Sequence, residues 1–342
     1  MTSRTAKPGR PAALVVLPLI VLALVFGTLP MWTDDYWIRV WTGVAMWAGL
    51  AASWNIIGGY AGYISFGHVA FFGIGAYATA ILMQPGYDWN FFLTLPVGAV
   101  IAGLFALIVG WPTLRLRGAY FAIATWALAE ALAQIINTLD FTGGSFGLST
   151  PGNPSTWFFY YAMLIATILI YLLTFLLFER SRFGYKVKAV RDNEAAAQSL
   201  GINTTAVKLQ AFMLSAALPA VLGGINAYWI TFINPQSVLS GEVTDQMVVM
   251  TLIGGLGHLW GPALGAFVLY LASTWLGAEY GGSTSYIAMI GALLAIIILF
   301  LPDGLIGLAP RARGMKLVRK MLGLSGAPGG GGAGTAPPGG RP

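Results

Sequence analysis

Long apolar runs separated by short polar stretches dominate the chain. Ten of these runs come close to the roughly 20 residues that a helix needs to cross a membrane, at about 11–30, 36–57, 66–84, 91–112, 118–139, 157–178, 210–232, 244–258, 262–278 and 284–307. The first run follows basic residues, as in a signal peptide. It is too long for a typical signal sequence and lacks a cleavage site of small residues, which predicts a retained helix. The pattern therefore predicts an all-α polytopic membrane protein with about ten transmembrane helices.

Composition supports a membrane protein over a soluble one. Of the 342 residues, 57% are hydrophobic and only 9% are charged, whereas about a quarter of a soluble domain is charged. The chain has no cysteine, which excludes disulfides, thiolate metal sites and cysteine nucleophiles. A net charge of +6 could indicate nucleic-acid binding. In a membrane protein such an excess more often reflects basic cytoplasmic loops, and no nucleic-acid partner is predicted.

The positions of the basic residues predict the topology. With the N-terminus inside, seventeen of the 18 Lys and Arg residues fall on the cytoplasmic side, and only Arg39 does not. The predicted outer loops carry mainly Asp and Glu. This asymmetry predicts that both termini are cytoplasmic, with an N-terminal segment 1–10, a transmembrane domain 11–308 and a tail 309–342. The tail begins with basic residues expected at the lipid surface and continues as a Gly/Pro-rich segment that is expected to be disordered.

Two glycine-rich segments stand out, NIIGGYAGYISFGHVAFFGIGAY (residues 55–77) and TLIGGLGHLWGPALGAF (residues 251–267). Paired glycine-interrupted segments in two halves of a transporter indicate broken helices beside a substrate path. Small residues that let membrane helices pack closely are the alternative. We assign the following residues of these segments to a translocation path or to a contact between permeases: Gly58, Gly59, Ser65, Gly67, His68, Gly73, Gly75, Gly254, Gly255, Gly257, Trp260 and Gly261.

Glu130 lies in the middle of a predicted span, where an ionisable group costs at least about 2.5 kcal/mol unless it faces protein or water. It could line the path, act in proton transfer, or make a structural hydrogen bond inside the bundle. His68 and His258 are the only two histidines, and they are too few to predict a metal site. No lysine follows a glycine, so the phosphate-binding loop of common ATPases is absent. Since no nucleophile elbow is present either, we predict a chain without enzymatic activity.

The longest internal polar segment, 179–210, contains the block VRDNEAAAQSLGIN. Asp192, Asn193 and Glu194 can start a helix, and Gly201 is a natural stop. The block thus predicts a two-turn helix from Asp192 to Leu200 on the cytoplasmic side. Its apolar face would consist of Ala196, Ala197 and Leu200. Arg191, Asp192 and Glu194 would supply charges at the rim of this face. Such a helix suggests a docking surface for another protein, whereas the plainer alternative is a polar loop.

RDNEAAAQSLGIN resembles the cytoplasmic Glu-Ala-Ala…Gly loop by which permeases of ABC transporters couple to their ATPase subunits. Glu194 stands one position early relative to Gly201, and the Leu-Pro pair comes late, at Leu218-Pro219. Together with WNIIGGYAGYISFGHVAFFGIGAYATA and IGGLGHLWGPALGA, the longer stretch KAVRDNEAAAQSLGINTTAVKLQAF resembles the LivM-type permease of branched-chain amino-acid ABC transporters. The resemblance covers residues 36–310.

The resemblance implies one subunit of an importer in the bacterial inner membrane. Its partners would be a second, LivH-type permease, two cytoplasmic ATPases that hold ATP and Mg²⁺, and an extracytoplasmic solute-binding protein. This chain would carry no cofactor of its own, and segment 179–210 would couple it to the ATPases. Two alternatives are kept: a permease of the same family for urea or amides, and a secondary transporter in which Glu130 couples to an ion gradient.

Overall fold

The computed structural model of the protein describes residues 24–152, 155–281, 291 and 304–307, and these are mostly helical. The principal helices are α2 (Asp35–Asn55), α3 (His68–Leu82), α4 (Phe91–Thr113), α5 (Ala119–Thr138), α6 (Thr156–Thr174), α9 (Thr204–Ile230), α11 (Gly241–Gly254) and α12 (Gly261–Tyr280). The shorter ones are α7 (Arg182–Asp192), α8 (Glu194–Ser199) and α10 (Pro235–Val238). Two π-helical turns, η2 (Ile56–Tyr60) and η5 (Phe175–Glu179), extend α2 and α6. The remaining turns are 3-10 helices at Leu29–Met31, Asp140–Thr142, Gly144–Phe146 and Leu305–Gly307.

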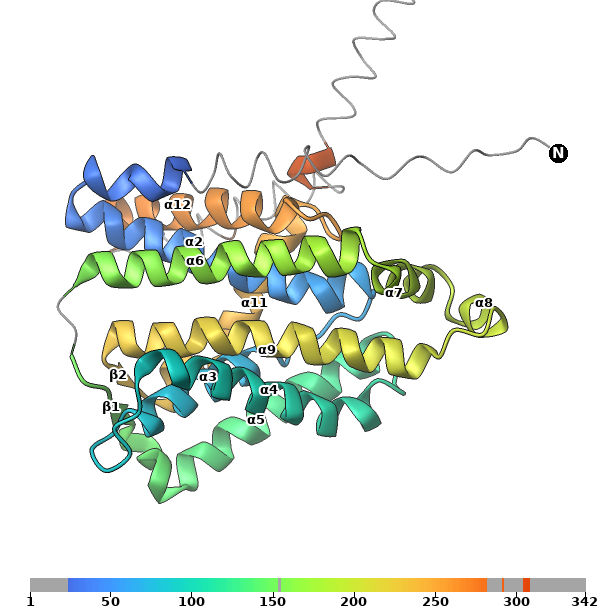
Figure 1. Ribbon diagram of the computed structural model, residues 1–342, viewed down its shortest axis with the longest axis horizontal. Helices are drawn as coiled ribbons and strands as arrows, with labels where there is room; N and C mark the ends of the chain where they lie inside the picture. The colour runs from blue at the N-terminus through green and yellow to red at the C-terminus, as the bar shows by residue number, and fades with distance from the viewer. Residues whose placement is uncertain (1–23, 153–154, 282–290, 292–303, 308–342) are drawn as a thin grey trace, which may run out of the picture.

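The long helices run side by side, so the molecule has two distinct ends (Figure 1). Helices α7 and α8 project from one end, which we call the α8 end. The strands β1 (Leu148–Ser149) and β2 (Phe232–Ile233) lie at the other, which we call the β end. These strands pair antiparallel, with Leu148 opposite Ile233. Helix α9 spans the distance between the two ends and packs along α3 and α4.

Six helical segments are long and apolar enough to cross a membrane, namely Asp35–Tyr60, Phe91–Thr113, Ala119–Thr138, Thr156–Glu179, Thr204–Ile230 and Gly261–Tyr280. Each matches one predicted span. Helix α9 begins six residues before the predicted start at 210, because Asn203 caps it by accepting a hydrogen bond from the amide of Ala206. The fold is therefore that of an all-α polytopic membrane protein.

The structure does not confirm ten transmembrane helices. The predicted spans 66–84 and 244–258 correspond to α3, with 15 residues, and α11, with 14 residues. At 1.5 Å per residue both are shorter than the roughly 30 Å of hydrocarbon in a bilayer. Helix α3 is instead surrounded by the rest of the chain, and most of its residues are buried. The predicted spans 11–30 and 284–307 lie mostly outside the described residues.

Both glycine-rich segments interrupt their helices. After the π turn η2 the chain leaves helical geometry, with Gly62 at φ +79°, and helix α3 begins only at His68. The second break lies between α11 and α12, where Gly255 and Gly257 have φ values of +123° and +72°. Only glycine adopts such angles readily. His68 is the first residue of α3 whereas His258 lies in a loop, so the two Gly-His pairs do not occupy equivalent positions.

Other glycines, in the two segments and in α9, allow helix backbones to touch. A Cβ atom on Gly75 would lie 1.9 Å from the carbonyl oxygen of Ala220 on α9, and one on Gly223 would lie 2.0 Å from that of Phe72 on α3. Between α11 and α12, a Cβ on Gly254 would lie 1.7 Å from the oxygen of Gly261. Small residues at such contacts let membrane helices approach closely. Close packing therefore accounts for these glycines.

The contact between α3 and α9 provides a stability test. We expect Gly75→Ala to lower the thermal unfolding temperature of the purified protein, because the added methyl group collides with backbone atoms that cannot rotate away. Gly103→Ala on α4 is the matched control, since nothing lies within 4 Å of a Cβ there. This variant should be neutral or more stable by up to about 1 kcal/mol, because alanine favours a helix over glycine. Equal effects of the two substitutions would contradict the close-packing account.

Candidate functional site

The projecting α7–α8 segment is organised by side-chain caps. Ser181 accepts hydrogen bonds from the amides of Phe183 and Gly184 at the start of α7, and Asn193 accepts one from the amide of Ala196 at the start of α8. Gly201 follows α8 at φ +78°, as expected for a glycine that ends a helix. The predicted helix is present but shorter, because Asp192 ends α7 and α8 covers only Glu194–Ser199.

The predicted apolar face of α8 is divided between two environments. Ala197 is only 2% exposed and packs against the core of its own chain, so the prediction that it belongs to an outward docking face was wrong. The outward face consists of Ala195, Ala196, Ser199 and Leu200. Leu200 is 81% exposed.

Glu194, at the start of α8, is held inside the chain. Its carboxylate accepts hydrogen bonds from Lys208 Nζ at 2.6 Å, from Thr204 Oγ1 at 3.2 Å and from Tyr63 Oη at 3.2 Å. Arg117, in the loop between α4 and α5, completes the group with a salt bridge of 3.3 Å. A role of Glu194 as a rim charge for a partner stays a prediction, and its side chain already bonds to these four residues of its own chain.

Lys208 is the cation at the centre of this cluster. Its side chain is 7% exposed, and its ammonium also donates to the Leu114 carbonyl at 3.1 Å and to Tyr63 Oη at 3.1 Å. The same ammonium lies 5.1 Å from the centre of the Tyr63 ring. A buried ammonium is tolerated only when its donors are used and a carboxylate balances its charge. The Glu194–Lys208 pair meets both conditions and ties α8 to α9 and to the segment after η2.

The cluster sets the charge state of Glu194. Burial by itself raises the pKa of this carboxyl, but the hydrogen bond and charge of Lys208, with help from Thr204 and Arg117, lower it by more. The pKa of Glu194 in the folded protein therefore lies below its ordinary value of 4.5. The resulting stabilisation is complete above the ordinary value and is lost as the pH falls through the lower folded-state value. Glu194 is thus charged at neutral pH.

Arg191, near the end of α7, reaches the place where the two broken segments meet. Its Nη1 donates to the Gly59 carbonyl at 3.1 Å, and its guanidinium also pairs with the neighbouring Asp192 at 3.2 Å. Asn55 joins the two breaks, because its side chain accepts from the amide of Gly257 at 2.9 Å and donates to the carbonyl of His258 at 3.0 Å. A displacement of α7 and α8 would therefore act directly on both breaks.

The other residues assigned to the path lie mostly at buried contacts between helices. His68 is buried between the hydroxyls of Ser65 and Ser215, at 3.1 and 3.3 Å. A Cβ on Gly67 would lie 2.5 Å from the Thr125 carbonyl oxygen. Close contacts of the same kind, with Trp54, Leu239 or the glycines of the second segment, surround Gly58, Gly73, Gly254 and Gly261. Trp260 stacks on Tyr171 with ring centres 5.8 Å apart. A role for these residues in a path remains a prediction.

Sequence reasoning missed Lys208, Tyr63, Arg117 and Asn55. Lys208 lies near the start of α9, an otherwise apolar helix. Basic residues are common at the ends of membrane spans, so its presence there did not indicate a buried ion pair. Tyr63 and Asn55 belong to a glycine-rich segment in which only the glycines and Gly-His drew notice. Their partners are between 14 and 203 residues away in the chain. No helical or strand spacing indicates contacts at such separations.

Comparison with known proteins agrees with this architecture. Residues 37–301 match the family described as the permease component of branched-chain amino acid transport systems. LivM, the high-affinity branched-chain amino acid permease protein of Salmonella typhimurium, is 27% identical over 86% of this chain and 74% of its own length. LivH of the same organism is 27% identical over 79% of this chain and 94% of its own length.

Among solved structures, PsaBC from Streptococcus pneumoniae in complex with Fab is a weak match. It has a TM-score of 0.45 and 14% identity, and covers 83% of this chain and 95% of that chain. The match to the family covers more than three quarters of the sequence and contains both broken segments and the α7–α8 segment. The chain belongs to the family of permease components of branched-chain amino acid transport systems.

Proposed function

We propose that the chain is the LivM-type permease subunit of an ABC importer and moves branched-chain or related amino acids into the cytoplasm. In this proposal ATP and Mg²⁺ bind to two cytoplasmic ATPase subunits. A LivH-type permease completes the membrane path, and an extracytoplasmic binding protein delivers the solute. The observation that carries the proposal is α8, a small helix with an exposed face that a buried ion pair anchors to α9 and to the segment after the first break.

The anchoring explains how such a helix could transmit motion. A helix of six residues is not stable by itself in water. Without anchoring contacts, α8 would unfold or shift when a partner moved, and the motion would not reach the rest of the chain. The bonds of Glu194 to Lys208, Thr204 and Tyr63 fix α8 to α9 and to the first break. Arg191 holds the end of α7 on Gly59 at the junction of the two breaks. Closure of the ATPase pair would therefore displace α8 and rearrange the broken segments together.

Topology is part of the proposal. In the proposal the α8 end lies in the cytoplasm of the bacterial cell. Its basic residues, including Arg180, Arg182, Lys186 and Lys188, support this orientation through the positive-inside rule. Both termini would lie on the same side. We expect a reporter fused within residues 140–156 to be active only outside the inner membrane, and a reporter fused to the tail only in the cytoplasm. Reporters that both indicate one side would contradict this arrangement.

The function is tested with the complete complex in liposomes. We expect leucine uptake to require ATP on the side of the membrane that carries the ATPases, and to depend on the binding protein. Uptake should continue when proton and sodium gradients are collapsed. Uptake that follows an ion gradient and ignores ATP would instead support a secondary transporter. ATP-dependent uptake of urea or amides without leucine uptake would keep the ABC mechanism and change the substrate.

A further inference from the structure

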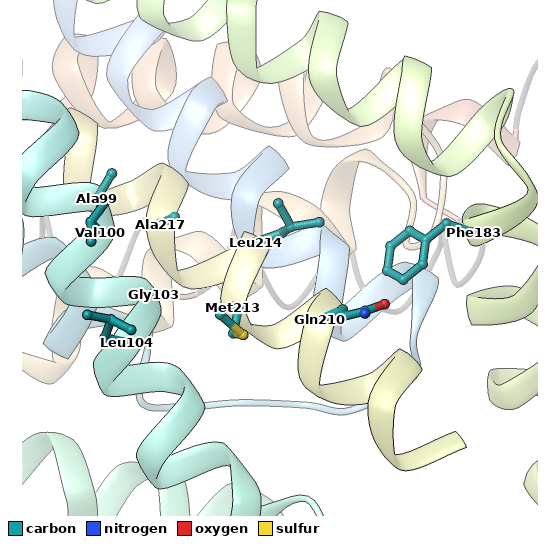
Figure 2. A pocket seen from close by; sticks show the side chains of 9 residues that line it. All are labelled: Ala99, Val100, Gly103, Leu104, Phe183, Gln210, Met213, Leu214 and Ala217. Carbon is teal, nitrogen blue, oxygen red and sulfur yellow. The ribbon is translucent and has the colours of Figure 1, made fainter. Parts of the chain in front are cut away.

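Two hollows of opposite character lie on the surface of the described residues. A groove of about 550 Å³ between α4 and α9 is almost wholly apolar. Figure 2 shows Val100 and Leu104 of α4 together with Met213 and Leu214 of α9 along it, with Gln210 as the polar exception. Lipid chains or an apolar helix can cover such a surface without cost. This groove offers almost nothing that would hold a charged solute.

The second hollow is polar. A cavity of about 330 Å³ lies between the later half of α5 and the connection from α10 to α11. Its residues are Glu130, Ala133, Gln134 and Asn137 from α5, Pro235 and Gln236 from α10, Leu239 and Ser240 from the connection, and Gly241 at the start of α11. Glu130, Gln134 and Asn137 are four and three residues apart, so they share one face of α5. The volume is within the range of small-molecule sites.

The Glu130 carboxylate has to be solvated by water or paired with a cation in this cavity. It lies eleven residues after Ala119, which is about 17 Å along the axis of a helix that crosses the membrane. Its side chain makes no ion pair and no hydrogen bond within the part of the chain that the structure describes. An unpaired carboxylate at that depth is costly in lipid and is found facing water or protein. The polar face of α5 therefore cannot be a lipid-facing surface.

The same face of α5 becomes apolar toward the α8 end. Ile123 and Trp126, seven and four residues before Glu130, are 60% and 54% exposed. A solute that enters from the β end would first meet a carboxylate and the amides of Gln134 and Asn137, then apolar side chains. An amino-acid zwitterion with an apolar side chain matches this order. Its ammonium group can pair with the Glu130 carboxylate, and its carboxylate can accept hydrogen bonds from the amide N–H groups of Gln134 and Asn137. Its side chain can contact the apolar part of the same face of α5.

We infer that the cavity between α5 and the α10–α11 connection is a water-filled vestibule in which Glu130 binds the ammonium group of the amino acid. The inference rests on the proposed import function and names the part of this chain that meets the solute. Glu130 acts here as a fixed anion. It does not carry protons across the membrane.

The absence of cysteine from the chain allows a direct test with single introduced thiols in the complete complex. Gln134→Cys should react with charged methanethiosulfonates added from the outside of membrane vesicles. Ile135→Cys is the matched control, since Ile135 is 53% exposed but does not line the cavity. It should stay unreactive because the inference puts it outside the water-filled cavity. Labelling is measured as a mass shift of this chain, so thiols of other subunits do not interfere.

The charge of the reagent tests the role of Glu130. The thiol at position 134 should react about tenfold faster with the ethylammonium reagent than with the ethylsulfonate reagent, after correction for their intrinsic rates, because a carboxylate within a few ångströms attracts one and repels the other. Adding Glu130→Gln should remove this preference. In a chain without introduced thiols, Glu130→Gln should reduce leucine uptake by at least about tenfold.

Several outcomes would overturn the inference. These are an unreactive thiol at position 134, equal reactivity at positions 134 and 135, or a reagent preference that Glu130→Gln does not change. The first result would be expected if a cationic side chain of the partner permease covered Glu130. ATP dependence of uptake is measured in the same vesicles. ATP-driven uptake with an unreactive position 134 would refute the vestibule alone, whereas a reactive position 134 with ATP-independent uptake would refute the import mechanism alone.

Discussion

Replacing Glu194 with alanine is expected to separate ATP hydrolysis from transport. The change leaves the Lys208 ammonium buried without its carboxylate, and breaking such a pair costs about 3–5 kcal/mol. Helix α8 also loses its bonds to Tyr63 and Thr204, so it should detach from the first broken segment. We expect leucine uptake to fall at least about tenfold while the ATPases still co-purify and hydrolyse ATP. Faster hydrogen exchange in residues 194–203 should accompany the loss.

A double variant separates charge balance from coupling. Glu194→Gln combined with Lys208→Met removes both charges at once, and such replacements are often neutral for stability. We expect the double variant to recover most of the unfolding temperature lost in Glu194→Ala and to recover uptake only in part, because the bonds to Tyr63 are weakened. Normal uptake and normal hydrogen exchange in Glu194→Ala would show that the cluster does not transmit motion from α8.

Ala196→Glu is expected to abolish ATPase binding while the permease still inserts in the membrane. Ala196 and Leu200 lie on the outward face of α8, where burial against an ATPase cleft would contribute a few kcal/mol at about 25 cal/mol per Å². A carboxylate forced into that contact would cancel about 3 kcal/mol of it, which corresponds to about a hundredfold loss in affinity. Co-purification of the ATPases and solute-stimulated ATP hydrolysis measure this loss.

Three further substitutions define the surface. Thr205→Glu, on an exposed position at the start of α9, should leave ATPase binding intact, since a carboxylate is also favourable at a helix N-terminus. Gly201→Val should weaken binding less than Ala196→Glu, because it opposes the left-handed conformation of Gly201 by roughly 1–2 kcal/mol. Ala197→Glu should lower the folded yield, because Ala197 is buried in the chain itself. Equal loss at positions 196 and 205 would indicate a general effect of negative charge.

The features predicted correctly from the sequence depend on neighbours in the chain. The cap at Asn193 and the left-handed Gly201 follow from the preferences of one or two residues, so they could be read from the block itself. The six long spans follow from continuous apolar composition. The predicted spans 66–84 and 244–258 form helices shorter than a full crossing, because apolar composition indicates removal from water and does not distinguish lipid from the interior of the protein.

The sequence by itself determined that this is a polytopic helical membrane protein with a short capped helix between two spans, because hydropathy and helix caps act over a few residues. Tertiary structure decided that Ala197 turns inward, that Glu194 pairs with Lys208, and that Asn55 and Arg191 join the two breaks. It also decided that Glu130 lines a polar cavity. These contacts depend on how helices distant in the chain pack, and no local preference of a residue specifies which distant partner it meets.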